Sequence, residues 1–166
     1  FSQVMGTLDH AVYSAMVRGI EKLPEQMERI LEQAEHIHDI AKRCAGREDV
    51  FFIGRNLDYA LSLEGSLKLK EISYIHSEAY ASGELKHGTI SLIEDGTLVI
   101  ALGTYTPLFD KAMSNVVEVK ARGAEVLALA TEPLKEKMAH TADSVIAVPE
   151  THPVVQPSLG VVPLQL

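Results

Sequence analysis

From Asp49 to the end of the chain, short apolar runs alternate with longer stretches of helical periodicity, and this alternation constrains the fold most. The mainly apolar runs lie at residues 50–53, 98–102, 125–130 and 144–148. The helical stretches between them lie at residues 58–74, 107–122 and 133–140. Strands that are apolar on both faces and are separated by helices indicate a parallel sheet with helices on both sides. The pattern therefore predicts an α/β fold.

The N-terminal third of the chain predicts helices that pack on this α/β body. Residues 9–19 have the pattern of a short helix. A longer helix is expected to begin near Pro24, because the first turn of a helix tolerates proline, and to end with Gly46 as its C-cap. Apolar residues recur at helical spacing throughout this longer stretch.

The length of 166 residues suits one domain with an appended element. We interpret residues 1–46 as a helical arm or linker and residues 47–166 as the domain. The last apolar run begins near Val161 and has the pattern of a helix that stops short at Leu166. We therefore expect the domain to be truncated in its C-terminal helix.

The composition excludes several classes of protein. A net charge of −8 argues against a nucleic-acid binder, which needs a basic face. It leaves room for a phosphorylated ligand, because backbone amides at a helix N-terminus can hold an anion. Cys44 is the single cysteine, so neither an intrachain disulfide nor a cysteine zinc cluster can form. No secretory signal or apolar run of membrane-spanning length occurs, so we expect a cytoplasmic protein that does not contact membranes.

Three charged residues share one face of the predicted helix at residues 58–74. Glu64, Lys68 and Glu71 follow the spacing i, i+4, i+7, which places them within about 60° of one another. Because the rest of this helix is so apolar, we expect it to be buried, with its charged stripe in a cleft or paired internally. A carboxylate in an apolar setting can act as a general base. The alternative is a surface ion pair between Glu64 and Lys68, which such spacing more often means.

The polar segment at residues 76–88 has the composition of a functional loop and contains His87. On chemistry alone, a single histidine is more often a capping or packing residue than a catalyst. The remaining histidines offer no metal site, since His36 and His38 are two positions apart on a helix and face different ways.

Residues 63–88 read LEGSLKLKEISYIHSEAYASGELKHG. This stretch closely resembles the isomerase domain of the glutamine–fructose-6-phosphate amidotransferases (glucosamine-6-phosphate synthases), and specifically the second of their two tandem SIS (sugar isomerase) domains. The resemblance implies a three-layer α/β/α sandwich with a five-stranded parallel sheet. It also implies a homodimer that makes glucosamine 6-phosphate from fructose 6-phosphate and ammonia released from glutamine, without a metal or cofactor. The first SIS domain and the glutaminase domain would lie elsewhere in the longer chain.

The same resemblance implies a role for each matching residue. Glu71 would move a proton between C1 and C2 of the sugar, and Lys68 would stabilise charge near the reacting oxygens. Glu64 would position Lys68 or contact the sugar substrate. His87 would assist opening of the sugar ring in the active site of the partner subunit.

Two departures from the family pattern bear on activity. The family's Schiff-base lysine lies in a C-terminal tail beyond the point at which this chain ends, and its phosphate-binding loop lies in the first SIS domain. The corresponding loop here, at residues 103–107, is interrupted by Tyr105 and Pro107, so we do not expect it to bind phosphate. We therefore expect this chain alone to be inactive. The alternatives are a sugar-phosphate-binding SIS module of a transcription regulator, without catalysis, and a structural dimerisation domain.

Overall fold

A computed structural model describes residues 2–166, and its centre is a parallel sheet of five strands in the order β2-β1-β3-β4-β5. The strands are β1 (Asp49–Gly54), β2 (His76–Ala81), β3 (Leu98–Gly103), β4 (Glu125–Thr131) and β5 (Ser144–Val148). The four predicted apolar runs form β1, β3, β4 and β5. The expected three-layer α/β/α fold is confirmed.

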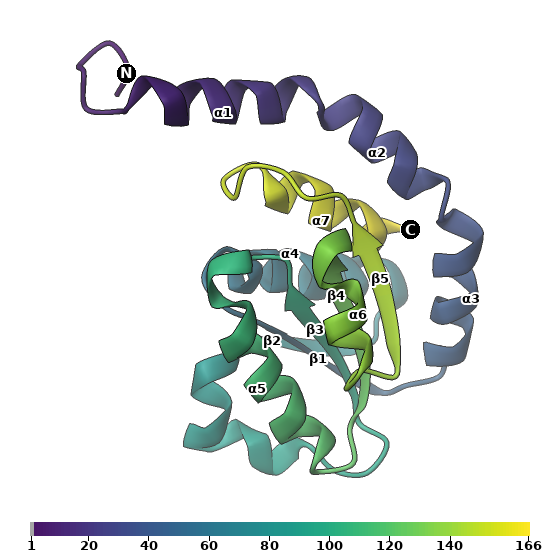
Figure 1. The fold of residues 1–166 in the computed structure, drawn as a ribbon. Helices are drawn as coiled ribbons and strands as arrows, with labels where there is room; N and C mark the ends of the chain where they lie inside the picture. The colour runs from purple at the N-terminus through teal and green to yellow at the C-terminus, as the bar shows by residue number, and fades with distance from the viewer. Residues whose placement is uncertain (1) are drawn as a thin grey trace.

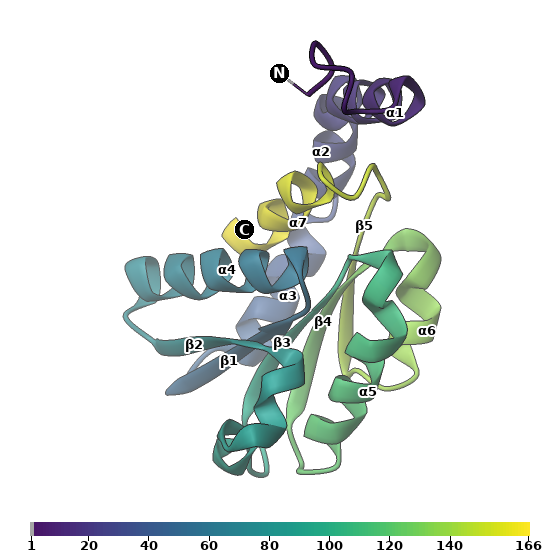
Figure 2. The same ribbon diagram turned by 90° about the vertical axis from the view of Figure 1, so that its left-hand side faces the viewer.

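Helices cover both faces of the sheet (Figures 1 and 2). The α-helices are α1 (His10–Glu21), α2 (Leu23–Leu31), α3 (Ala34–Cys44), α4 (Leu57–Ser73), α5 (Phe109–Lys120), α6 (Lys135–Ala139) and α7 (Gln156–Gln165). Short 3-10 helices are η1 (Ser82–His87), η2 (Thr89–Leu92), η3 (Thr106–Leu108) and η4 (Glu132–Leu134). Figure 2 shows α3, α4 and α7 on one side of the sheet, with α5 and α6 on the other.

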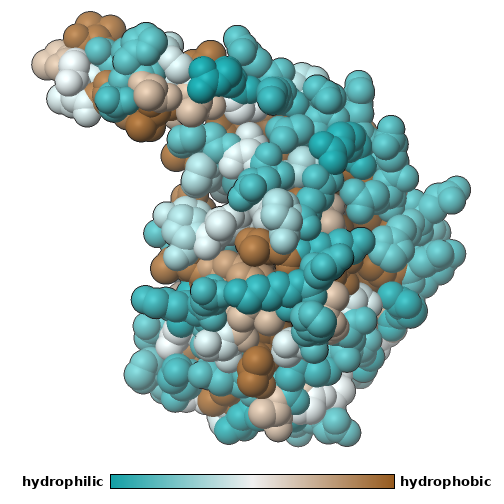
Figure 3. Space-filling model, viewed as in Figure 1, coloured by the Kyte–Doolittle hydropathy of each residue, from teal (hydrophilic) through white to brown (hydrophobic). Residues whose placement is uncertain are grey.

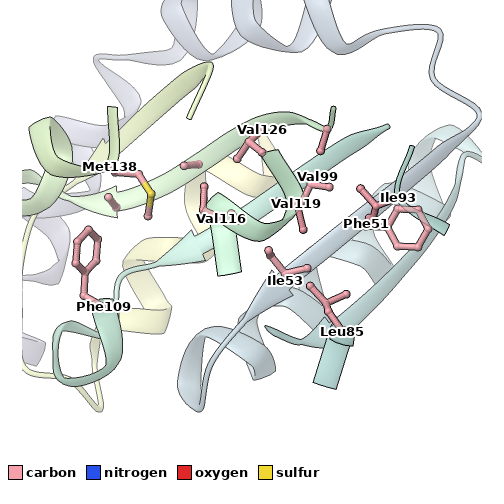
Figure 4. Close-up of a cluster of buried hydrophobic side chains, with 14 residues drawn as sticks. Phe51, Ile53, Leu85, Ile93, Val99, Phe109, Val116, Val119, Val126 and Met138 are labelled. Carbon is pink, nitrogen blue, oxygen red and sulfur yellow. The ribbon is translucent and has the colours of Figure 1, made fainter. Parts of the chain in front are cut away.

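The two faces of the sheet build separate cores, because successive strand residues point to opposite sides. In β1, Phe51 and Ile53 point toward α5 and join the buried cluster in Figure 4, together with Leu85 of η1 and Val116 of α5. Phe52 points the opposite way, toward α4. The strands β1 and β3 are therefore buried on both faces, as their apolar runs predict.

The N-terminal helices differ from the expected single helix between Pro24 and Gly46. The chain bends at Glu32 and Gln33, so that α2 and α3 are separate helices. The bend lets α2 and α3 follow the body, and the Gln33 side chain donates a hydrogen bond to the carbonyl of Ala147 at the end of β5. Gly46 has a φ of 85° one residue beyond the C-cap of α3, which is the left-handed conformation that ends many helices.

The helix α1 projects beyond the body and forms the overhang at the upper left of Figure 3. Exposed hydrophobic side chains lie along α1 and the segment before it: Val4, Met5, Val12 and Ile20. Its C-terminal end packs closely on the loop after β5, because a Cβ on Gly19 would lie 3.0 Å from Oγ1 of Thr151. The helix α1 is thus attached to the body at its C-terminal end.

The polar segment at residues 76–88 is not all loop, because its first half is the edge strand β2. Only one of its six residues is buried, so its sequence is polar and escaped the search for apolar runs, unlike that of β5 at the other edge. Ser77 is its one buried residue with an inward hydrogen bond, to Oγ of Ser66 on α4 at 2.9 Å. The second half of the segment forms η1, which ends at His87.

A buried carboxylate fixes the start of α4. Asp58 is 3% exposed and accepts hydrogen bonds from Oγ1 of Thr104 at 2.5 Å and from the backbone N–H of Tyr105 at 2.9 Å. Burial raises the pKa of the Asp58 carboxyl, and these hydrogen bonds oppose the rise. The contact ties α4 to the loop after β3, at the carboxyl end of two neighbouring strands.

Replacing Asp58 with alanine should destabilise the protein by about 1–3 kcal/mol, because the buried hydroxyl of Thr104 and the N–H of Tyr105 would lose their acceptor. Urea unfolding measures this change. Asp39→Ala, at an exposed pair with Lys42, is the matched control and should change stability by less than about 0.5 kcal/mol. Equal stability of Asp58→Ala and the unaltered protein would contradict the assigned role.

The same carboxyl should make stability depend on pH. The pKa of Asp58 is raised in the folded protein from its ordinary value of 3.8, so the folded state binds this proton more readily than the unfolded state. The stabilisation is fully present below pH 3.8 and is lost as the pH rises through the raised pKa. Relative to Asp58→Asn, the unaltered protein should therefore lose unfolding free energy as the pH rises from about 4. A difference that is constant with pH would contradict this assignment.

Candidate functional site

The three predicted charged residues of α4 meet on its surface. Lys68 lies between the two carboxylates, with its Nζ 2.8 Å from Oε2 of Glu71 and 3.7 Å from Oε1 of Glu64. The hydrogen bond and charge of Glu71 raise the pKa of Lys68, so its ammonium stays protonated at neutral pH. The spacing thus produces a continuous stripe in which one cation is held by two anions.

The stripe is more open than expected. Side-chain exposure is 30% for Lys68, 43% for Glu64 and 52% for Glu71. Hydrophobic residues beside it are exposed too: Leu63, Leu67, Ile72 and Tyr74. The expectation that α4 is buried is therefore wrong for its outward face, whereas the expected internal pairing of its charged residues is present. Its outward face combines paired charges with apolar side chains, as a surface that receives a second protein surface does.

Small residues on the sides of α4 away from the stripe let the helix pack closely on the body. Ser62 and Ser66 are buried, as expected for close packing, whereas Ser73 is exposed. A Cβ on Gly65 would lie 2.9 Å from the ring of Phe52 and 3.0 Å from Leu164 of α7. With no room for a side chain here, α4 cannot rotate about its axis without a clash.

His87 lies on the other side of the sheet from this stripe. It is exposed at the end of η1, whose Leu85 is buried in the cluster under α5. The helix α4 packs on the face shared with α3 and α7. The structure therefore brings together Glu64, Lys68 and Glu71 and does not bring His87 to them within one chain.

The loop after β3 has its polar groups occupied internally. Ligands of parallel α/β sheets bind at the carboxyl ends of the strands, where the strand order reverses, and here β1 and β3 meet at that point. The hydroxyl of Thr104 and the N–H of Tyr105 already bind Asp58, and Thr106 Oγ1 donates to Glu150 at 3.1 Å. That this loop does not bind phosphate stays a prediction.

Two hollows differ in their relation to the stripe. A groove of about 270 Å³ between α3, α4 and the end of α7 is apolar, and Lys68 lies on its rim. A larger hollow of about 500 Å³ lies at the amino ends of β1, β2 and β3, and carboxylates such as Glu48, Asp49 and Asp95 line it. The predicted residues Glu64, Lys68 and Glu71 lie on α4, with Lys68 lining the smaller hollow, so we assign the candidate site to α4.

Sequence reasoning missed a polar network that joins the loop after β1 to α5 and η1. Its members are Arg55, Asn115, Glu118 and Lys86. One signal was available, because Asn115 falls on the apolar, core-facing side of the predicted helix at residues 107–122, where an amide needs partners.

Within residues 2–166, no three histidine, cysteine, aspartate or glutamate side chains gather closely enough to hold a metal ion. None of the helices described is both long and apolar enough to cross a membrane.

Comparison with known proteins shows which family the chain resembles. The family model of the SIS domain matches residues 44–166. The glutamine–fructose-6-phosphate aminotransferase [isomerizing] of Symbiobacterium thermophilum is 51% identical over 164 residues, which are 99% of this chain and 27% of that protein. The protein of the same name from Clostridium tetani is 48% identical over 166 residues, 100% of this chain and 27% of the relative. The chain thus spans about a quarter of the length of the curated relatives it matches.

Solved structures agree with the fold. The C-terminal domain of glucosamine-fructose-6-phosphate aminotransferase from Francisella tularensis has a TM-score of 0.92 and 32% identity, covering 99% of this chain and 46% of that one. The sugar isomerase domain of an RpiR transcription factor from Sphaerobacter thermophilus has a TM-score of 0.71 at 16% identity, covering 89% and 86%, and shares the fold alone. With a parallel α/β/α sandwich and a matching family model over most of its length, the chain belongs to the SIS domain family.

Proposed function

We propose that this chain is the second SIS domain of a glutamine–fructose-6-phosphate aminotransferase and contributes the acid–base residues that isomerise the sugar. The observation that carries the proposal is the stripe on α4, in which Lys68 is held between Glu64 and Glu71. Identities of 51% and 48% to relatives with that name support the substrate assignment. The substrate would be fructose 6-phosphate and the product glucosamine 6-phosphate.

The stripe has the chemistry that this isomerisation needs. Moving a proton between C1 and C2 requires one base that reaches both carbons, and the Glu71 side chain is 52% exposed on the outward face of α4. The Lys68 ammonium, 2.8 Å from that carboxylate, can stabilise negative charge on the neighbouring sugar oxygens. Glu64 holds the ammonium from the other side and restrains its position.

A second protein surface would complete the site. General base catalysis is more effective where water is excluded, and α4 alone leaves its carboxylates open to solvent. We propose that a second copy of the chain covers this face and brings its own His87, since His87 lies across the sheet from Glu71 in one chain. The phosphate of the sugar would bind to another part of the longer protein.

We also propose that residues 1–46 join this domain to the rest of that longer protein. The match to the SIS family model begins at residue 44, close to the expected start of the domain at residue 47. The projecting α1, with exposed side chains such as Val12 and Ile20, supports an arm that packs against something beyond this domain.

The alternatives make different demands on the structure. A sugar-sensing SIS module binds phosphate without proton transfer, so it needs free hydroxyl and amide donors at the carboxyl ends of its strands. Here Thr104 and Tyr105 donate to Asp58, whereas the charged groups of the stripe on α4 are exposed to solvent. A structural dimerisation domain would use the apolar residues around the stripe and tolerate loss of its charges. Substitution of Glu71 separates this reading from the proposed function.

In the full-length enzyme, Glu71→Gln should lower the rate of isomerisation by at least about 10²-fold, because the change removes a base and keeps the shape of the side chain. The rate of glucosamine 6-phosphate formation measures this effect. Glu35→Gln, at an exposed position on α3, is the matched control and should leave the rate unchanged. Near-normal activity of Glu71→Gln, with an unchanged unfolding midpoint, would leave the stripe as a structural ion pair.

Mixed dimers test whether the two subunits share the site. Glu71→Gln and His87→Ala are each expected to inactivate the full-length enzyme. When equal amounts are refolded together, about half of the dimers should contain both chains, and each mixed dimer should have one intact site and one doubly altered site. Activity should then recover to about a quarter of that of the unaltered enzyme.

If both residues act within one chain, every site in a mixed dimer keeps one lesion and no activity returns. Native mass spectrometry counts the mixed dimers, so that failure to recover is separated from failure to mix. Mixed dimers without activity would overturn the shared site.

A further inference from the structure

We infer that the network of Arg55, Asn115, Glu118 and Lys86 positions His87, so that Asn115 and Glu118 of α5 act as positioning residues for the reaction. The expected effect on catalysis rests on the proposed function, whereas the restraint of η1 by the network does not. The network links three segments that are distant in sequence: the loop after β1, the helix α5 and the 3-10 helix η1.

The contacts form an unbroken chain. Nε and Nη2 of Arg55 donate to Oδ1 of Asn115 at 3.0 and 2.9 Å. Nδ2 of Asn115 donates to Oε2 of Glu118 at 3.0 Å. Nζ of Lys86 donates to Oε1 of Glu118, also at 3.0 Å. Every partner in the chain is thus matched donor to acceptor, and both carboxylate oxygens of Glu118 are engaged.

The buried residue Asn115 distinguishes this network from a surface ion pair. Its side chain is 1% exposed and faces the core of the domain, so its amide must be paired internally. The guanidinium on one side and the carboxylate on the other allow only one orientation of the amide. The hydrogen bond from Asn115 and that from Lys86 lower the pKa of Glu118, which keeps the carboxylate charged.

The network holds η1 at both ends, with a buried anchor between. At the start of η1, a Cβ on Gly83 would lie 3.2 Å from Nη1 and Nη2 of Arg55, so the guanidinium packs against the backbone. In the middle, Leu85 is 0% exposed. At the end, Lys86 is bound by Glu118, and His87 follows directly. The backbone of His87 is therefore restrained while its ring points outward to solvent.

The same helix α5 supplies a comparison. Its Asp110 pairs with Lys137 of α6 at 2.5 Å, but Asp110 is 83% exposed and has no link to η1. Exposed pairs of that kind contribute little. Glu118 differs because it is joined to a buried amide and, through it, to the loop that precedes α4.

The test uses Glu118→Gln and Lys86→Met in the full-length enzyme, with Asp110→Asn as the matched control. Hydrogen exchange should become faster in residues 82–88 of both test variants and stay unchanged in the control. The kcat of Glu118→Gln should fall by about 10- to 100-fold, because a misplaced catalytic group costs that much, with little change in KM for fructose 6-phosphate. Lys86→Arg, which keeps the cation, should retain most of the activity.

A double-mutant cycle then separates positioning of His87 from other effects. If Glu118 acts through His87, adding Glu118→Gln to His87→Ala should lower kcat no further. A loss that multiplies in the double variant would overturn the inference, as would unchanged exchange in residues 82–88. Full activity of His87→Ala would instead refute the role of His87 in the proposed function, and exchange would still decide whether the network holds η1. Lys86 is an exposed residue, so Lys86→Met keeps the test valid if Glu118→Gln does not fold.

Discussion

The close contact between α4 and the sheet is the interaction on which the rest of the candidate site depends. Gly65 lets the helix approach Phe52 of β1 and Leu164 of α7 so closely that a single added carbon would clash. Ser66 adds a hydrogen bond to Ser77 of β2. Ser66 lies opposite Glu64, Lys68 and Glu71 on this helix, and Gly65 lies about a quarter turn from them. The packing of these two small residues therefore fixes the direction in which the charged residues face. The orientation of α4 about its own axis thus determines both its packing on the sheet and the direction of its charged residues.

The fold separates the site residues onto two faces of one sheet. The face with α4 carries the carboxylates and the ammonium, and the face with α5 and η1 carries His87. Residues that one chain holds apart can meet only between chains, which makes assembly a condition for chemistry under the proposed function. The exposed side chains of Leu63 and Leu67 beside the stripe have the apolar character that such an assembly would bury.

Sequence reasoning succeeded where a local pattern carries the information. Inner strands buried on both faces leave apolar runs, and helical spacing places Glu64, Lys68 and Glu71 together, so these features were predictable. It failed for β2, whose sequence is polar, and for the bend between α2 and α3, which follows the surface of the body. It also predicted that the outward face of α4 is buried, because a sequence does not distinguish exposed leucines such as Leu63 from core leucines such as Leu61.

The polar network could not be predicted from the sequence, because it depends on contacts between segments that are distant in the chain. Arg55 and Asn115 are 60 positions apart, and Lys86 and Glu118 are 32 positions apart. No local spacing connects such residues. Only the placement of Asn115 among apolar neighbours hinted that an amide there needed partners, and it did not reveal which ones.

The position of β2 at the end of the sheet bears on how the protein avoids aggregation. One side of its backbone pairs with β1, and within residues 2–166 no strand pairs with the other side. Open edges of this kind can recruit strands from other molecules. Along β2, the exposed His76 lies between Asp49, at 2.7 Å, and Glu78, at 3.8 Å. A foreign strand that docks there would have to strip water from these polar and charged groups. The polar sequence that conceals β2 from a search for apolar runs therefore also protects its edge.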